Sequence, residues 1–342
     1  MNTKVLIDTV KALVADDKGL LAMDGSNPTC DKRFAKLRIP QTGEARRAYH
    51  EMIVTSASLG ECISGAIPCD ETIRQTTSEG IPFGKAVIDA GVIPGKKVDS
   101  GTKDMAGHPG EKVIECLDGL RDRLVEYVQL GARFAKWRAV IAIGDGIPSR
   151  ACIEANAHAM ARYTALCQEA GLGTIVEPGV LMDGKHTLAQ CFAGTEQVLR
   201  TVFDRLFTQK VVLEGMLLKP SMVLPGSTCH TQEPVDAVVD ATVKCLARAI
   251  PAAVPGIAFL SGGRTPELAL ARLNAVNLRF KWRPPWSVAF SFARAIQQPA
   301  MEIWSGQLAN VKAAQQALLQ RARCNLAARR GECNAAMEVT GV

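Results

Sequence analysis

Lys219 is the residue whose setting in this sequence most clearly suggests chemistry. It lies in an apolar stretch, residues 214–223, that predicts a buried strand interrupted by a proline at position 220. Burial removes water from a lysine ammonium, which disfavours the charged form and lowers the pKa of the group. A neutral amine can attack a carbonyl carbon and form a Schiff base. The alternative is a lysine whose ammonium reaches solvent from the end of a strand.

Polar side chains also fall where other apolar stretches end. They are Asp24, Lys97, Asp99, Lys136, Arg138, Glu177, Ser261 and Arg294. If these stretches are parallel strands of one sheet, their carboxyl ends meet on one face, and charges of both signs gather there. Such a cluster indicates a functional site, and the alternative is a layer of salt bridges closing that face.

Eight short apolar stretches predict the strands that would bring these residues together. They are residues 19–24, 62–68, 92–99, 132–138, 173–178, 214–223, 257–263 and 287–292. Helical patterns follow most of them, at 43–57, 117–128, 153–167, 186–207 and 235–249. A lead-in helix is expected at 3–15, and Asn310 is expected to cap a final helix.

The alternation of strand and helix predicts a parallel sheet covered by helices, and eight strands favour a single-domain (β/α)₈ barrel. An open doubly wound sheet is the rival, but the glycine fingerprint of a dinucleotide-binding sheet is absent. We expect one domain over residues 1–330, with a short tail at 331–342.

Two groups of small and basic residues indicate phosphate binding. Ser261, Gly262 and Gly263 follow the seventh strand, where backbone N–H groups can approach an anion, and Arg294 follows the eighth. Ser26, Thr29, Lys32 and Arg33 lie in an expected polar loop after the first strand, and Lys97 could join them as a second anion site.

Composition narrows the class of protein. The 342 residues carry 40 basic and 34 acidic side chains, a net charge of +6, without a basic block interleaved with aromatics. Nucleic acid is therefore not an expected partner. The 11 cysteines form no CxxC pair and the 5 histidines are scattered, so neither a metal nor another cofactor is expected. With no apolar run of about 18 residues and no signal-peptide core, we expect a cytoplasmic protein without membrane contact.

Several segments together resemble a known family. In chain order, LAMD, GKKVDSG, ARFAKWR, IVEP, EGMLLKPSMV, PGIAFLSGG and FSFARA resemble the class I (Schiff-base) fructose-1,6-bisphosphate aldolases, from about residue 5 to about residue 330. The resemblance implies a lyase that needs no cofactor, acts on a sugar phosphate and assembles as a homotetramer. It implies that Lys219 is the Schiff-base lysine, Glu177 the proton-transferring carboxylate and Asp24 the carboxylate near the bond that breaks.

The same resemblance implies roles for the remaining site residues. Lys136 and Arg138 would be the flanking cations. One phosphate would bind Ser261, Gly262, Ala293 and Arg294, and the other would lie towards Ser26, Arg33 and Lys97.

The chain also departs from the family pattern. Gly179 stands where a second glutamate is usual, and a C-terminal tyrosine that assists proton transfer at the enamine is missing; further departures are Gly25, Ser100 and Phe292. These differences predict an aldolase whose activity is reduced. The alternatives are a catalytically retired barrel that binds sugar phosphates or a protein partner, and a Schiff-base enzyme for a different ketose phosphate.

Overall fold

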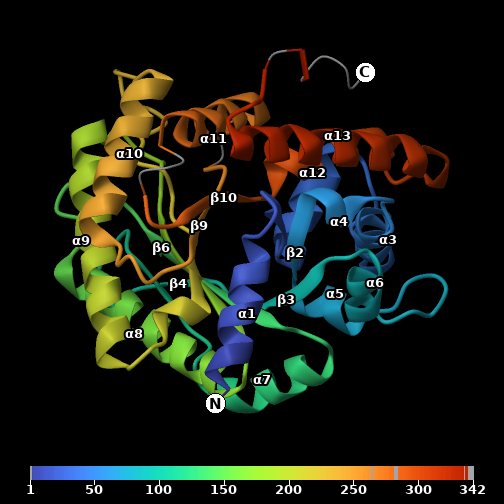
Figure 1. Cartoon of the computed structure of the whole chain (residues 1–342), viewed down its shortest axis with the longest axis horizontal. Helices are drawn as coiled ribbons and strands as arrows, with labels where there is room; N and C mark the ends of the chain where they lie inside the picture. Colours follow the sequence, from blue (N-terminus) through green and yellow to red (C-terminus); the bar gives the residue numbers. More distant parts are fainter. Residues whose placement is uncertain (1, 263–264, 281–283, 335, 338–342) are drawn as a thin grey trace.

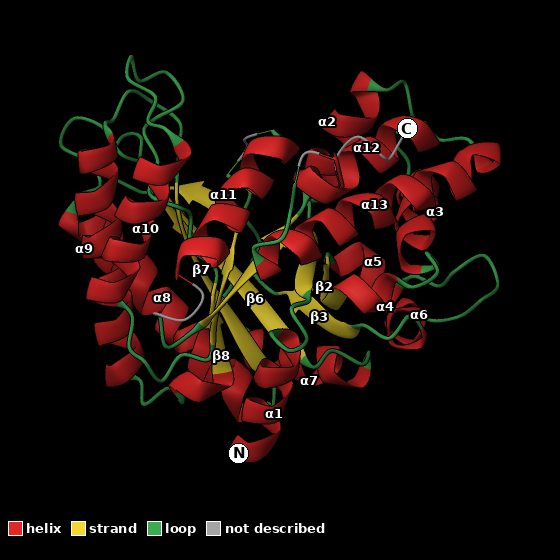
Figure 2. Ribbon diagram, turned by 45° about the horizontal axis from the view of Figure 1, so that its top comes forward, coloured by secondary structure: helices red, strands yellow, loops and turns green. Residues whose placement is uncertain are grey.

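The computed structural model of the chain describes residues 2–262, 265–280, 284–334 and 336–337. Within them, eight parallel strands close into a barrel in the order β1-β10-β9-β8-β7-β6-β3-β2, and helices surround it (Figures 1 and 2). The strands are β1 Gly19–Met23, β2 Ile63–Pro68, β3 Ile93–Lys97, β6 Phe134–Ile141, β7 Gly173–Val180, β8 Met216–Leu218, β9 Gly256–Phe259 and β10 Ser287–Phe292. The first and last strands pair directly, with Leu20 opposite Ser291, so the barrel has no free edge.

Helices occupy every connection between the strands. They are α2 Asn27–Lys36, α3 Gly43–Val54, α4 Leu59–Cys62, α5 Asp70–Arg74, α6 Phe83–Asp89, α7 Leu120–Gln129, α8 Arg150–Glu169, α9 Leu188–Thr208, α10 Val235–Ala249 and α11 Pro266–Phe280. Before β1 comes α1 Thr3–Leu13, and after β10 come α12 Arg294–Trp304 and α13 Val311–Arg330. A small hairpin, β4 Thr102–Asp104 with β5 Lys112–Ile114, extends from the end of β3, and two 3₁₀ turns cover Leu213–Gly215 and Leu308–Asn310.

The predicted barrel and all eight predicted strands are confirmed, with three local corrections. Residues expected as a polar loop after β1 form α2, because a proline in its first turn favours the helix start. The strand expected from residue 214 begins at Met216, after a 3₁₀ turn. The β4–β5 hairpin and helices α4, α5, α6, α11 and α12 were not predicted. Gly263 of the expected seventh strand and residues 335 and 338–342 of the expected tail lie outside the described residues.

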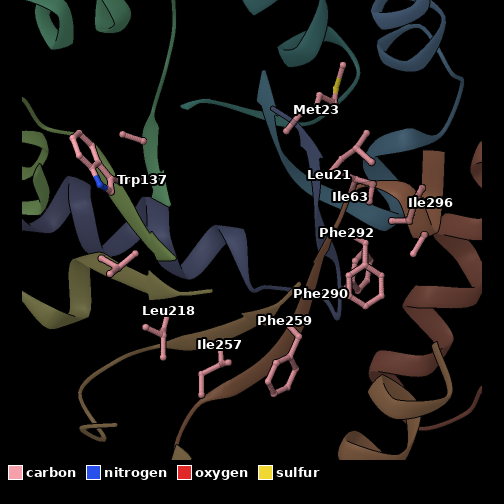
Figure 3. Packing of buried hydrophobic residues seen from close by; sticks show 14 of the residues in the cluster. Leu21, Met23, Ile63, Trp137, Leu218, Ile257, Phe259, Phe290, Phe292 and Ile296 are labelled. Carbon is pink, nitrogen blue, oxygen red and sulfur yellow. The ribbon is translucent and has the colours of Figure 1, made fainter. Parts of the chain in front are cut away.

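Alternation along each strand divides the barrel into an inner and an outer layer. Outward side chains pack under the helices, among them Leu21, Leu218, Ile257, Phe259 and Phe290 (Figure 3). Their neighbours face inward and form a separate cluster: Leu20, Ile67, Phe134, Ile175, Leu217, Ala258 and Ala289. Side chains two residues apart on a strand share a face. Residues two and four positions after an inward apolar residue therefore also face the barrel interior.

Helix α1 closes the amino-terminal end of the barrel. Val10, Leu13 and Val14 belong to the inner cluster. At the other end of the chain, Arg329 of α13 donates from Nη2 to the carbonyl oxygen of Val14 at 2.6 Å. The barrel interior is therefore apolar towards its amino-terminal end, and its polar side chains lie at the carboxyl ends of the strands. No helix in the described part of the chain has the length and apolar character needed to cross a membrane.

Candidate active site

A cavity of about 920 Å³ opens at the carboxyl ends of the barrel strands. Every site residue predicted from the sequence lines it: Asp24, Ser26, Arg33, Lys97, Lys136, Arg138, Glu177, Lys219, Ser261, Gly262, Ala293 and Arg294. Strand alternation explains the convergence. Phe134 and Ile175 face inward, so Lys136 and Glu177, two positions later, do so too, and Leu217 directs Lys219 in the same way.

Four charged side chains form a compact cluster at the base of this cavity. The Nζ atom of Lys136 lies 2.5 Å from Oδ2 of Asp24 and 3.0 Å from Oε2 of Glu177. The Nζ atom of Lys219 lies 3.2 Å from the same Glu177 oxygen. Lys136, Glu177 and Lys219 are 1 %, 3 % and 3 % exposed, so these charges interact with little screening by water.

The pKa values of the two lysines of this cluster are shifted in opposite directions. Burial lowers the pKa of Lys219, and the nearby Lys136 ammonium adds to that effect, although Glu177 opposes it. Burial also acts to lower the pKa of Lys136, but Asp24 and Glu177 outweigh it and raise that pKa above its usual value. Lys219 is therefore the amine that can become a nucleophile, while Lys136 stays an ammonium.

Both carboxyl groups remain ionised despite their burial. Burial acts to raise the pKa of Asp24, but the ammonium groups of Lys136 and Lys219 outweigh it and lower that pKa. The pKa of Glu177 is likewise lowered, against burial, by Lys136, Lys219 and Arg138. The cluster thus contains a nucleophilic amine, a permanent ammonium and two carboxylates able to accept protons.

One end of the cavity offers a place for an anion. Arg294 is the first residue of α12 and Ala293 is its N-cap, and both line the cavity, so a helix start borders it. Gly262 has a φ of +62°, a backbone conformation that disfavours larger residues. These residues, with Ser261, form the first predicted phosphate end.

The residues of the second predicted phosphate site, Ser26, Arg33 and Lys97, contact other protein side chains. The Ser26 and Thr29 hydroxyl oxygens lie 2.9 Å apart at the start of α2. Arg33 donates to Gln298 at 3.3 Å, and the Lys97 ammonium lies 3.3 Å from Oδ1 of Asp99. These residues of the second predicted phosphate site therefore line the same cavity, and Arg33 and Lys97 each have a protein partner.

Sequence reasoning missed part of the cavity wall. Gln297 of α12 donates to the Ala22 carbonyl oxygen at 2.7 Å and accepts from the Tyr49 hydroxyl at 3.2 Å. His50 lies beside Tyr49 and donates to or accepts from Thr72 at 2.8 Å. Gln297, Tyr49 and His50 lie inside helices rather than at strand ends. Only the pattern of buried faces along those helices could have identified them as cavity residues.

The described residues contain no group of three or more histidine, cysteine, aspartate or glutamate side chains able to hold a metal ion. The cavity lining includes amines, guanidinium groups, carboxylates and hydroxyl groups.

Comparison with known proteins identifies the family. A sequence profile described as "Fructose-bisphosphate aldolase class-I" matches residues 5–341. A "Probable fructose-bisphosphate aldolase class 1" of Xanthomonas campestris is 52 % identical over 326 residues, which cover 95 % of this chain and 97 % of that protein. The chain belongs to the class I fructose-bisphosphate aldolases.

Relatives of this aldolase extend beyond bacteria. "Fructose-bisphosphate aldolase 6, cytosolic" of Arabidopsis thaliana is 47 % identical over 308 residues, covering 90 % of this chain and 86 % of that one. A solved fructose-bisphosphate aldolase of Plasmodium falciparum, crystallised with TRAP and a small-molecule inhibitor, superposes with a TM-score of 0.95 at 39 % identity, covering 97 % of this chain and 96 % of that chain. The barrel fold and the lyase class of this aldolase follow from its family.

Proposed function

We propose that this protein cleaves fructose 1,6-bisphosphate reversibly to dihydroxyacetone phosphate and glyceraldehyde 3-phosphate through a Schiff base on Lys219. The observation that carries the proposal is the buried Lys219 amine, 3.2 Å from the Glu177 carboxylate and inside a cavity that is also lined by Ser261 and Arg294 and by Ser26, Arg33 and Lys97. Two groups of hydroxyl and basic residues suit a substrate that carries a phosphate at each terminus.

The first half of the reaction forms the imine. The neutral Lys219 nitrogen adds to the C2 ketone of the substrate, and the resulting carbinolamine loses its hydroxyl group as water. Glu177 is the group placed to relay the proton that this loss requires, since it contacts the Lys219 nitrogen. Lys136, which stays charged, stabilises the oxygen that becomes negative during the attack.

The second half breaks the C3–C4 bond. A carboxylate, which we assign as Asp24, accepts the C4 hydroxyl proton, C4 becomes the aldehyde, and the C3–C4 electron pair moves into the protonated imine to give an enamine. The imine thus avoids a free carbanion. Protonation of the enamine at C3 and hydrolysis of the imine release dihydroxyacetone phosphate and restore Lys219.

We expect turnover below that of family members that carry the second glutamate. Gly179 supplies no carboxylate. A single proton-transfer group contributes about 10²–10⁴-fold to a rate.

Borohydride reduction in the presence of dihydroxyacetone phosphate tests the proposal. Intact mass and peptide mapping should find one reduced adduct, on Lys219, and Lys219→Met should abolish both the adduct and cleavage of the bisphosphate. A folded protein that forms no adduct and cleaves no substrate would instead support the catalytically retired barrel, for which the departures at Gly179 and the tail are the motivation. Relative rates on fructose 1-phosphate and sedoheptulose bisphosphate would identify another preferred ketose.

The remaining assignments rest on the family. We propose that residues 1–330 act as one catalytic unit followed by a tail, that the protein works in the cytoplasm in glycolysis and gluconeogenesis, and that it assembles as a homotetramer. Light scattering coupled to gel filtration tests the last point, because a monomer would elute with the 36.6 kDa mass of one chain.

A further inference from the structure

Gly179 on β7 and Arg138 on β6 lie beside each other at the edge of the charged cluster. In the parallel register of these strands, Arg138 is paired with Glu177, and Val140 with Gly179. Positions 177 and 179 share the inward face of β7 because side chains alternate along a strand. A side chain at 179 would therefore enter the same space as Glu177 and Arg138.

The space beside Gly179 holds the Arg138 side chain. A Cβ atom added to Gly179 would lie 3.4 Å from Nε of Arg138, an ordinary van der Waals distance, and 2.9 Å from the backbone oxygen of Ala139, which is a close contact. The φ of Gly179 is not in the left-handed region, so the backbone conformation does not require glycine there. Glycine thus avoids a close contact with the Ala139 backbone, and Arg138 passes beside it.

Arg138 extends through that space to Glu177. Its Nε atom lies 3.3 Å from Oε1 of Glu177, while the side chain as a whole is 43 % exposed. Nε itself is buried and has no hydrogen-bond partner among the described residues, so its main interaction is the charge of Glu177. The backbone N–H of Arg138 donates to Oδ2 of Asp99 at 3.2 Å, which fixes the point from which the side chain starts.

The two oxygens of Glu177 thus have different neighbours. Oε2 faces the ammonium groups of Lys136 and Lys219, and Oε1 faces Arg138. The charged groups around Glu177 come from four strand ends: Lys136 and Arg138 on β6, Lys219 after β8, Asp24 after β1, and Lys97 with Asp99 at the end of β3. Arg138 is the member of this set placed to hold the carboxylate from the side opposite Lys219.

We propose that Arg138 is a positioning residue for Glu177, which holds Oε1 so that Oε2 faces the reacting Lys219 nitrogen. The inference rests on the proposed function, since it concerns the proton transfer that accompanies imine chemistry. Among the cations that lower the pKa of Glu177 against burial, Arg138 acts after Lys136 and Lys219. Arg138 therefore supports the carboxylate from its Oε1 side.

The test compares pH profiles of kcat/KM for fructose 1,6-bisphosphate. Arg138→Met removes the cation, and an opposite charge within about 4–6 Å shifts a carboxyl pKa by about 1–3 units. Because Arg138 is partly exposed, we expect the acid limb to move up by about one pH unit, at the low end of that range. Arg138→Lys should return part of the shift. The matched control is Arg133→Met, an exposed arginine just before the same strand, at the opposite end of the barrel.

A profile unchanged by Arg138→Met, with only a higher KM, would overturn the positioning role and leave Arg138 as a substrate contact.

Borohydride trapping of dihydroxyacetone phosphate keeps the two proposals separate. An adduct on Lys219 in every variant shows that each is folded and forms the imine, so an unchanged pH profile then counts against Arg138 alone. Absence of the adduct in the parent protein counts against the proposed function.

Discussion

Two buried lysines with lowered pKa values lie on opposite sides of the barrel wall. Lys219 is 3 % exposed and Lys96 is 2 % exposed. Burial is the main cause of the lowered pKa in both. By burial and pKa alone, the two residues would be equal candidates for a nucleophilic amine.

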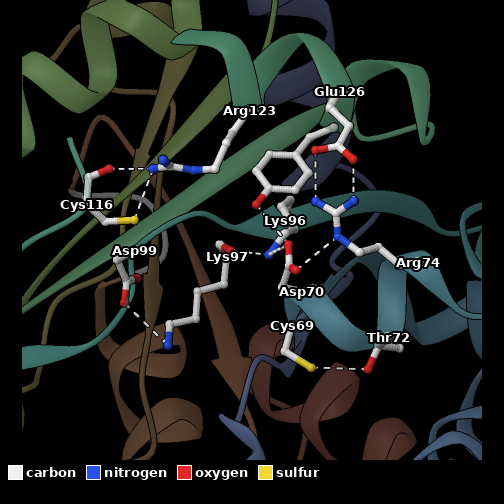
Figure 4. Close-up of polar contacts among 11 residues, drawn as sticks. Cys69, Asp70, Thr72, Arg74, Lys96, Lys97, Asp99, Cys116, Arg123 and Glu126 are labelled. Carbon is white, nitrogen blue, oxygen red and sulfur yellow. Dashed lines mark hydrogen bonds and ion pairs between the residues drawn. The ribbon is translucent and has the colours of Figure 1, made fainter. Parts of the chain in front are cut away.

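Their surroundings separate them. Lys96 faces outward from β3, where its Nζ donates to the Lys97 carbonyl oxygen at 2.5 Å, lies 3.4 Å from Oδ1 of Asp70 and sits 4.7 Å from the centre of the Tyr127 ring (Figure 4). Arg74 joins the same network by pairing with Asp70 and Glu126. Lys219 instead faces the cavity. A lowered lysine pKa indicates chemistry only where the amine has space for a carbonyl beside it.

Replacing each lysine by methionine should separate the two regions most strongly. Lys219→Met removes the nucleophile, so we expect cleavage of fructose 1,6-bisphosphate to fall by more than the roughly 10⁴-fold that one proton-transfer group contributes. Lys96→Met should leave turnover near that of the parent. Steady-state kinetics on both variants measures this, and a large loss of kcat in Lys96→Met would show that the outer cluster takes part in catalysis.

The carboxylates beside the two lysines, Glu177 and Asp70, should also differ in their effect on kcat. Glu177→Gln keeps the shape but removes the proton acceptor, so we expect kcat to fall by about 10²–10⁴-fold. Asp70→Asn, beside Lys96, is the matched control and should change kcat little. Comparable losses in both variants would mean that stability, not proton transfer, explains the effect.

For stability, Lys96→Met should have a larger effect than Lys219→Met. Lys96→Met leaves the Lys97 carbonyl without its donor, so we expect the free energy of unfolding to fall by about 1–3 kcal/mol. Lys219→Met replaces a desolvated amine with an apolar side chain, and the free energy of unfolding should stay level or rise by about 0.5–2 kcal/mol. Urea unfolding measures both; a larger loss for Lys219→Met would assign it a structural role.

Acid pH should remove the contribution of Asp24 to stability, and this effect should be smaller than those of the substitutions above. Since the folded-state pKa of Asp24 lies below its ordinary value of 3.8, its contribution to stability is present above that pH and is lost as the pH falls further. Unfolding free energy measured at and below about pH 4 should fall less steeply in Asp24→Asn than in the parent. Asp145→Asn, which replaces an exposed carboxylate, should show the parent's slope.

The sequence indicated the inner region better than the outer one. Strand ends with charged residues and the apolar runs before them predicted the barrel and the convergence of Lys219, Glu177 and Lys136. Helix α2 was not predicted, because its few apolar residues give a weak periodicity and its polar residues favour a loop. Lys96 and Lys97 could have been separated by alternation alone, since Gly95 faces Phe134 inside the barrel and Lys97 shares that face.

Long-range contacts set the limit of such prediction. Gln297 and Tyr49 meet through a hydrogen bond across 248 residues, and no local pattern predicts which helix faces come together at that distance. The pairing of Arg138 with Glu177 likewise depends on the register of β6 with β7.

The closure of the barrel by its first and last strands affects how the protein is made. β1 cannot gain its second neighbour until β10 has left the ribosome, and the Arg329 contact with Val14 waits for α13. Until then a growing chain exposes strand edges that invite pairing with other chains. It also carries Lys219 long before Arg294 exists to complete the cavity. Catalytic competence should therefore appear only when synthesis is nearly finished.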